Sequence, residues 1–168
     1  KSKIFGKKNF LHEIETFKFM HEFAKHIQEK EVEVNKKAAN RLSSIYGQLD
    51  RKGFHKDDIS IFLSRILFCL FAEDSDVFEK DQFKEFIEKS GAKTLTGRMK
   101  ALFETLNTKE GERSEKDQFN LFPYVNGGLF EEEIKIPNLN EPVRQAILKC
   151  SDYDWSCVSP AIFGSNLD

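Results

Sequence analysis

Apolar side chains recur along most of this chain at the three- and four-residue spacing that places them on one face of an α-helix. The spacing predicts helices at about residues 8–30, 34–52, 57–72, 79–89, 96–107 and 140–151. The segment at 57–72 is apolar on nearly every side, which is typical of a helix in the middle of a bundle. The pattern therefore predicts an all-α fold, a bundle of about five or six helices.

One aromatic segment interrupts this helical pattern near the C-terminal end. Residues 120–130 read NLFPYVNGGLF, and both residues of Asn126-Gly127 tolerate the positive φ of a tight turn. The following EEEIKIP alternates like a short strand. We expect a small aromatic hairpin here, either as a plug over one end of the bundle or as a docking platform for a partner.

The same pattern divides the chain into two regions. We expect a helical bundle over residues 1–118. Residues 119–168 would hold the aromatic hairpin, the last helix and the start of a linker to a downstream domain. Ser159-Pro160 has the residues of a helix N-terminus, yet too few residues follow to give that helix bulk. This ending indicates a domain cut from a longer polypeptide.

Composition narrows the class of protein and its surroundings. The net charge of −2 excludes a domain that is basic overall, so any contact with nucleic acid needs a local patch. The cysteines, Cys69, Cys150 and Cys157, are odd in number and far apart, which favours reduced thiols in a cytoplasmic protein. The longest apolar run, near residues 66–72, is too short to span a membrane, so we expect no membrane partner.

One local basic feature stands on the second predicted helix. Lys37, Arg41, Gln48 and Lys52 fall within about 60° of one another around a helix axis. Lys37, Arg41 and Lys52 are therefore candidates for contacts with the phosphate backbone of DNA. The alternative is an ordinary solvated helix face.

Three sequence patterns resemble metal or catalytic motifs, and each lacks an essential feature. In HEFAKH, residues 21–26, the histidines are five apart, about 140° around a helix, where a zinc-protease helix needs four. The segment 74–85 has phenylalanine and glutamate where a calcium loop needs a ligand and a glycine. Glu133 and Lys135 with Asp117 match a magnesium nuclease only in residue types that often coincide by chance. We predict no catalytic, cofactor-binding or metal-binding residue in this chain, which also lacks phosphate-binding loops and an Asn-Pro-Pro-aromatic segment.

Longer stretches resemble one known family. FPYVNGGLFEEEIKIP, the later DWSCVSPAIFGS and the earlier SRILFCLFAEDSDVF are similar to segments of MmeI-like single-chain restriction–modification enzymes (type IIG/IIL) and related adenine-specific DNA methyltransferases. In that family a helical spacer links an N-terminal nuclease to a class-gamma aminomethyltransferase domain. The positions that match the family are structural ones: Pro123, Tyr124, Asn126, Gly127, Gly128, Trp155, Pro160 and Gly164.

The resemblance implies a function that belongs to a larger parent protein. It implies that this chain is the non-catalytic helical spacer of a DNA restriction–modification enzyme, an adenine-specific DNA methyltransferase with or without a nuclease. The parent would use S-adenosylmethionine and magnesium, and this fragment would bind neither. Its partners would be the neighbouring nuclease and methyltransferase domains and, weakly, the backbone of double-stranded DNA. A free-standing helical protein-interaction module is the alternative, and a self-contained magnesium nuclease ranks far below both.

Overall fold

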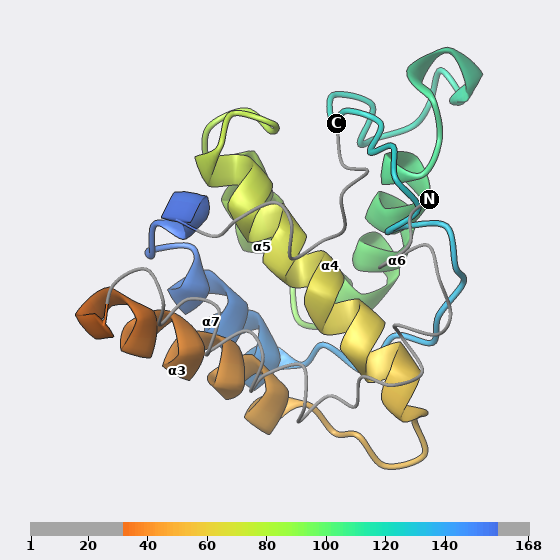
Figure 1. Ribbon diagram of the computed structural model, residues 1–168. Helices are drawn as coiled ribbons and strands as arrows, with labels where there is room; N and C mark the ends of the chain where they lie inside the picture. The colour runs from red at the N-terminus through yellow and green to blue at the C-terminus, as the bar shows by residue number, and fades with distance from the viewer. Residues whose placement is uncertain (1–31, 158–168) are drawn as a thin grey trace.

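The computed structural model describes residues 32–157, with side chains from residue 40 onward. This part of the chain contains five α-helices (Figure 1). No β-strand occurs in residues 32–157, so the predicted all-α fold is confirmed. All five helices predicted in this range are present, and the helix predicted at 8–30 lies outside the described residues. The helices are α3 (Val32–Gln48), α4 (Lys56–Asp74), α5 (Gln82–Lys89), α6 (Leu95–Leu106) and α7 (Glu141–Cys150). A short 3-10 helix, η1 (Glu110–Glu112), lies between α6 and α7, and a second, η2 (Trp155–Cys157), follows α7.

α4 is the central helix of the fold. Its residues from Ile59 to Glu73 are all buried, as its nearly uniform apolar sequence predicts. α3 and α7 lie side by side on one side of α4, and α6 lies on the other side (Figure 1). α5 packs against both α4 and α7, and η2 contacts α4. None of the described helices is long and apolar enough to cross a membrane.

Phenylalanine rings join the loops to the helices in one core. Phe68 of α4 makes edge-to-face contacts with Phe78 and Phe130, with ring centroids 6.1 and 5.9 Å apart. Phe130 also lies 5.4 Å from Phe103 of α6, and Phe78 lies 5.1 Å from Phe122. Such ring pairs stabilise a core beyond the burial of their area, so the aromatic segment belongs to the same packing unit as α4 and α6.

The N-termini of α7 and α5 are satisfied in different ways. Asn140 is the N-cap of α7: its Oδ1 accepts a hydrogen bond from the Val143 N–H at 3.2 Å, and proline follows in the first turn. The N-cap of α5, Asp81, makes no such side-chain bond. The buried Glu73 of α4 instead accepts from the Lys84 N–H at 2.8 Å. Burial raises the pKa of Glu73 to about 7, although this hydrogen bond lowers it.

The prediction of an aromatic hairpin is wrong, because the backbone of this segment forms no paired strands. Residues 119–130, named here the 119–130 loop, contain no strand, and neither does the EEEIKIP segment that follows. Positive φ angles fall on Gly127 (127°) and Gly128 (89°) and not on Asn126, so the predicted Asn-Gly turn does not form. A hairpin also needs main-chain carbonyls that are free to pair with another strand. The carbonyls of Leu129 and Phe122 instead accept hydrogen bonds from arginine side chains.

Candidate functional site: the 119–130 loop and its arginine anchors

Arg65, in the middle of α4, is the first anchor of the 119–130 loop. Its residue is only 2% exposed. Nε donates to the Leu129 carbonyl at 3.0 Å, and Nη2 donates to the Glu132 carbonyl at 2.6 Å. The guanidinium lies 5.1 and 5.3 Å from the ring centroids of Phe103 and Phe130. Burial lowers the pKa of Arg65 to about 10, so it stays charged at neutral pH and its hydrogen bonds are charge-assisted.

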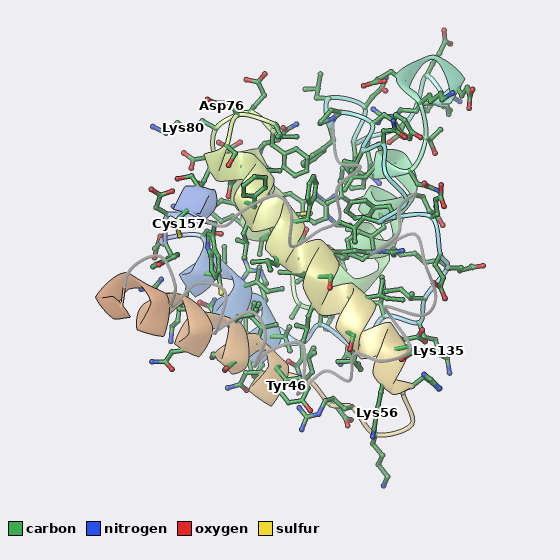
Figure 2. All side chains as sticks on the ribbon, in the orientation of Figure 1. Tyr46, Lys56, Asp76, Lys80, Lys135 and Cys157 are labelled. Carbon is green, nitrogen blue, oxygen red and sulfur yellow. The ribbon has the colours of Figure 1, made fainter. Side chains whose placement is uncertain are left out.

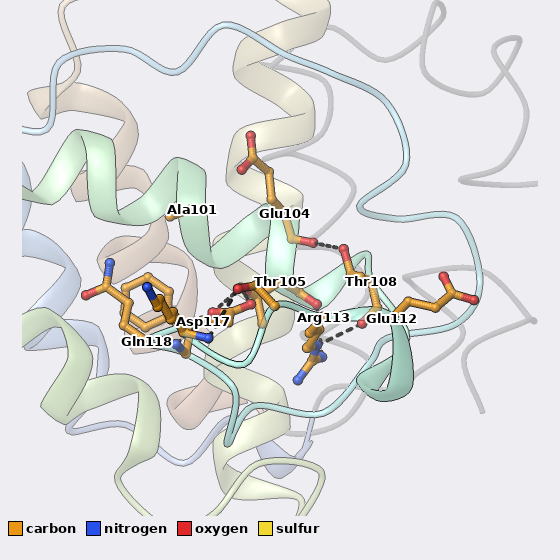
Figure 3. A pocket seen from close by; sticks show the side chains of 11 residues that line it. Ala101, Glu104, Thr105, Thr108, Glu112, Arg113, Asp117 and Gln118 are labelled. Atoms are coloured by element: carbon orange, nitrogen blue, oxygen red, sulfur yellow. Dashed lines mark hydrogen bonds between the residues drawn. The ribbon is translucent and has the colours of Figure 1, made fainter.

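Arg113 is the second anchor, and it ties the loop to the end of α6. Nη1 donates to the carbonyls of Phe122 at 2.6 Å and Asn120 at 3.1 Å. Nη2 and Nε donate to the carbonyls of Thr105 and Thr108, each at 2.9 Å. The side chain borders a cavity of about 370 Å³, which Figure 3 shows from close by. One guanidinium therefore holds together the carbonyls of two segments, which its planar fork of donors allows.

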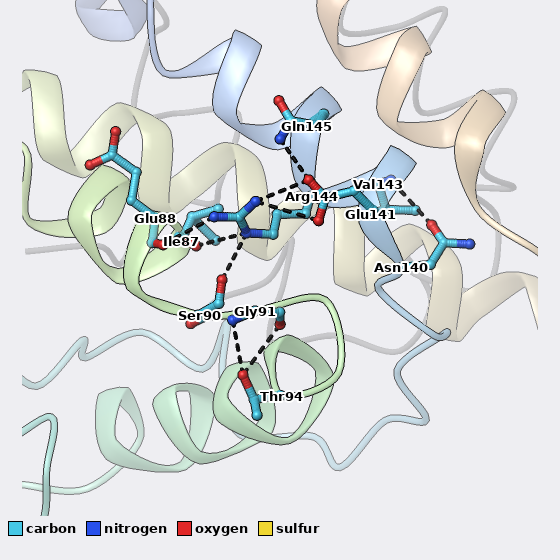
Figure 4. Close-up of polar contacts among 10 residues, drawn as sticks. All are labelled: Ile87, Glu88, Ser90, Gly91, Thr94, Asn140, Glu141, Val143, Arg144 and Gln145. Atoms are coloured by element: carbon cyan, nitrogen blue, oxygen red, sulfur yellow. Dashed lines mark hydrogen bonds and ion pairs between the residues drawn. The ribbon is translucent and has the colours of Figure 1, made fainter.

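Two further arginines cap the C-termini of helices from a neighbouring element. Arg144 of α7 donates through Nε to the Ser90 carbonyl at 2.8 Å and through Nη2 to the Glu88 carbonyl at 3.0 Å, both at the end of α5 (Figure 4). Arg41 of α3 donates through Nη1 to the Lys149 carbonyl in the last turn of α7. Cations are favourable there because the last carbonyls of a helix lack partners within it. These arginines therefore act within the fold.

Trp155 joins the end of α7 to the end of α4. The residue is fully buried, and its Nε1 donates to the Cys150 carbonyl at 2.7 Å. Its main-chain N–H donates to Asp74 Oδ2 at 2.8 Å, and its ring meets that of Tyr153 edge to face at 5.0 Å. Of the matched structural positions, it is the most deeply buried one that the structure describes.

The other matched structural positions lie in or beyond the 119–130 loop. Pro123, Tyr124, Gly127 and Gly128 are half-buried, and Asn126 is exposed. The Tyr124 N–H donates to Glu110 Oε2 at 3.0 Å, a further tie between the loop and η1. Leu121 projects from the same loop and is 90% exposed. Pro160 and Gly164 lie outside the described residues.

The predicted row of DNA-contacting residues is spread over more than one environment. Arg41 is half-buried. Its guanidinium donates to the Lys149 carbonyl of α7 and lies 6.0 Å from the centre of the Tyr153 ring. Lys52 is exposed in the turn after α3, where its N–H donates to Asp50 Oδ1 at 3.1 Å. The Lys37 side chain lies outside the described part of the chain. The assignment of all three to a DNA contact stays a prediction.

Asp117 and the buried thiols of Cys69 and Cys150 are parts of the fold. In the described part of the chain, no group of three or more His, Cys, Asp or Glu is arranged to hold a metal ion. Asp117 Oδ2 accepts from Thr105 Oγ1 at 2.8 Å, and Asp117 Oδ1 accepts from the Phe119 N–H at 2.9 Å. Burial raises the pKa of the Cys69 thiol, and that of Cys150 to about 12. Thiols in such surroundings are poor nucleophiles.

Gly127→Val is expected to lower the free energy of unfolding more than Gly53→Ala. Valine at a φ of 127° is strained by about 1–3 kcal/mol, because a β-branched residue does not adopt this backbone conformation readily. Gly53 also has a positive φ, 82°, but this lies nearer the left-handed helical region, which alanine enters at about 1–2 kcal/mol, and a Cβ there meets no atom within 4 Å. Urea unfolding followed by circular dichroism measures both changes. Equal losses would contradict the rigid loop described here.

Comparison with known proteins places these features in a family. Residues 57–130 match the family model described as MmeI, helicase spacer domain. The chain is 34% identical over 146 residues to DNA methyltransferase A of Bacillus subtilis (strain 168), covering 82% of this chain and 16% of that protein. It is also similar to the solved structure of the type IIL restriction-modification enzyme MmeI in complex with DNA. That likeness has a TM-score of 0.66 and 37% identity, and covers 75% of this chain and 18% of the other.

The matched segment holds most of the architecture described above. It includes α4, α5, α6 and the 119–130 loop, together with both arginine anchors. Residues 57–130 of this chain belong to the MmeI helicase spacer domain family.

Proposed function

We propose that this chain is the non-catalytic helical spacer of a longer DNA restriction–modification protein. The observation that carries the proposal is the family match at residues 57–130, in a chain that spans only 16% and 18% of two longer relatives. A spacer must hold its neighbours at a fixed separation. The buried Arg65 supports that role, because it fixes an irregular loop to the central helix through charge-assisted bonds.

The proposal extends to the parent protein and its surroundings. The parent is an adenine-specific DNA methyltransferase, with or without a nuclease, that acts in the cytoplasm. It uses S-adenosylmethionine for methyl transfer and magnesium for any cleavage. Nuclease and methyltransferase domains are the spacer's neighbours in the same polypeptide. The division at residue 118 stays a proposal: residues 119–168 would lead toward the downstream domain, although α7 in that region packs against α3 and α5.

The coding sequence on either side of this segment tests the spacer assignment. We expect an Asn-Pro-Pro-aromatic motif within about 200 residues downstream, the length of one to two domains. Its absence would favour the alternative, a free-standing interaction module. The specific observation in favour of that alternative is Leu121, because a leucine that is 90% exposed suits a contact with another protein.

We also propose that the spacer touches the DNA backbone weakly through Lys37, Arg41 and Lys52. Lys52 is exposed near the N-terminal end of α4, where Lys56 extends away from the molecule and Lys135 lies close by (Figure 2). Cations in such a position neutralise phosphates without reading bases. A net charge of −2 keeps the overall attraction small.

Binding of this chain to duplex DNA is expected to be weak, alike for unrelated sequences and steeply dependent on salt. Three phosphate contacts imply a slope of about −3 in a plot of log K against log salt concentration. Lys37→Glu with Lys52→Glu should reduce the magnitude of that slope by about 2, while Arg41 keeps its bond to α7. Fluorescence anisotropy on two unrelated duplexes measures this.

The matched control for the DNA measurement is Lys89→Glu with Lys93→Glu, two exposed lysines near the end of α5. The control pair should leave the slope unchanged. If both double variants behave like the unaltered chain, the assigned residues are not the contact surface.

A further inference from the structure

A cavity of about 280 Å³ lies between α6 and the segment that follows the 119–130 loop. Its apolar lining consists of Phe103 and Phe130, which are buried, and Ile134 and Ile136, which are half-buried. These side chains come from two different segments, and Arg65 contacts both: it donates to the carbonyls of Leu129 and Glu132, and its guanidinium lies 5.1 Å from the centre of the Phe103 ring. The cavity, named here the acidic groove, therefore has walls fixed by the core.

The rim of the acidic groove is strongly negative. Glu104 and residues 131–133 supply four exposed carboxylates, whereas Arg65 and Lys100 are the cations in the lining. Among the described residues, none of these four carboxylates has a cation within ion-pair distance. Unpaired like charges side by side create a potential that attracts a cationic partner.

Arg65 lines this groove, and the described part of the fold uses only two of its five N–H donors. Nε and Nη2 donate to the carbonyls of Leu129 and Glu132, but within the described residues Nη1 donates to no acceptor. A donor on a buried, charged group is costly to leave without a partner, so an acceptor is expected at Nη1. A free anion is repelled by the glutamates of the rim, whereas a main-chain carbonyl carries no net charge.

We propose that the acidic groove binds a basic segment of polypeptide. A main-chain carbonyl of that segment accepts from Arg65 Nη1, and its lysine or arginine side chains pair with the glutamates at 131–133. An apolar side chain packs on Phe103 and Ile134. This inference rests on the groove alone and does not depend on the spacer assignment. Charge-assisted pairs supply the selectivity, and the apolar floor supplies burial.

A peptide with this chemistry provides the test. The probe is fluorescein-labelled KSKIFGKKNF, the sequence of residues 1–10, which has four lysines and no acidic residue. Its matched control is QSQIFGQQNF, which keeps the apolar residues and removes the positive side chains. The full chain is titrated into each peptide at low salt, and anisotropy reports binding.

The rim variant carries Glu131→Gln, Glu132→Gln and Glu133→Gln. Its control carries the same change at three exposed glutamates elsewhere, Glu79, Glu88 and Glu115. The lysine probe should bind saturably, about tenfold more weakly to the rim variant and within twofold to the control. The glutamine peptide should bind at least tenfold more weakly to the unaltered chain. No saturable binding, or equal binding to both variants, overturns the proposal.

Discussion

Arg65→Met is expected to lower the free energy of unfolding by about 2–4 kcal/mol. Methionine keeps much of the side chain's packing against the two phenylalanine rings, so the loss reports mainly on the hydrogen bonds. The carbonyls of Leu129 and Glu132 lose their donors, at about 1–3 kcal/mol each. Release of the buried charge offsets part of this loss, since burial already lowers the pKa of Arg65 to about 10.

Arg51→Met is the matched control for Arg65→Met. Arg51 also donates to two main-chain carbonyls, those of Tyr46 and Leu49, but it is exposed. Water can replace its donors, so its loss should stay below about 1 kcal/mol. Urea unfolding measures both variants, and amide exchange should quicken in the 119–130 loop only for Arg65→Met. Similar losses for the two arginines would show that the loop is not held as described.

Trp155→Ala is expected to lower the free energy of unfolding by about 3–5 kcal/mol. The residue is fully buried, and removing its ring leaves a cavity where α7 meets the end of α4. Trp155→Phe separates packing from hydrogen bonding, because phenylalanine fills much of the space but cannot donate to the Cys150 carbonyl. Its loss should be about 1–3 kcal/mol. Urea unfolding of both variants tests this, and a loss below 1 kcal/mol for alanine contradicts the assigned contact.

The helices could be predicted because their apolar spacing is a local property of the sequence. The uniformly apolar segment at 57–72 indicates the central helix α4, and the spacing at 140–151 locates α7. The helix boundaries were less accurate, since α3 ends at Gln48 rather than near residue 52.

The shape of the 119–130 loop could not be predicted because distant side chains determine it. Asn126-Gly127 is a strong local signal for a hairpin, but Arg65 and Arg113 take the carbonyls that a hairpin would need. Arg65 is separated from Leu129 by 64 positions in sequence. One signal was available: a single arginine inside an otherwise apolar helix must have a buried partner.

The contacts of Arg41 and Arg144 also could not be predicted from the sequence. Each looks like a residue of a solvated helix face, and each in fact bonds the C-terminal carbonyls of another helix. Helix spacing gives the direction of a side chain around its own axis, but not which neighbour lies there. For that reason the predicted DNA row combined residues that the fold uses differently.

Calorimetric titration of the isolated chain with S-adenosylmethionine tests the central claim most directly. The claim is that this chain is a spacer and that the chemistry of the parent protein belongs to other domains. It predicts no measurable heat of binding up to millimolar cofactor, about 1000-fold above a micromolar site. Saturable binding in the micromolar range, with one cofactor per chain, would contradict it.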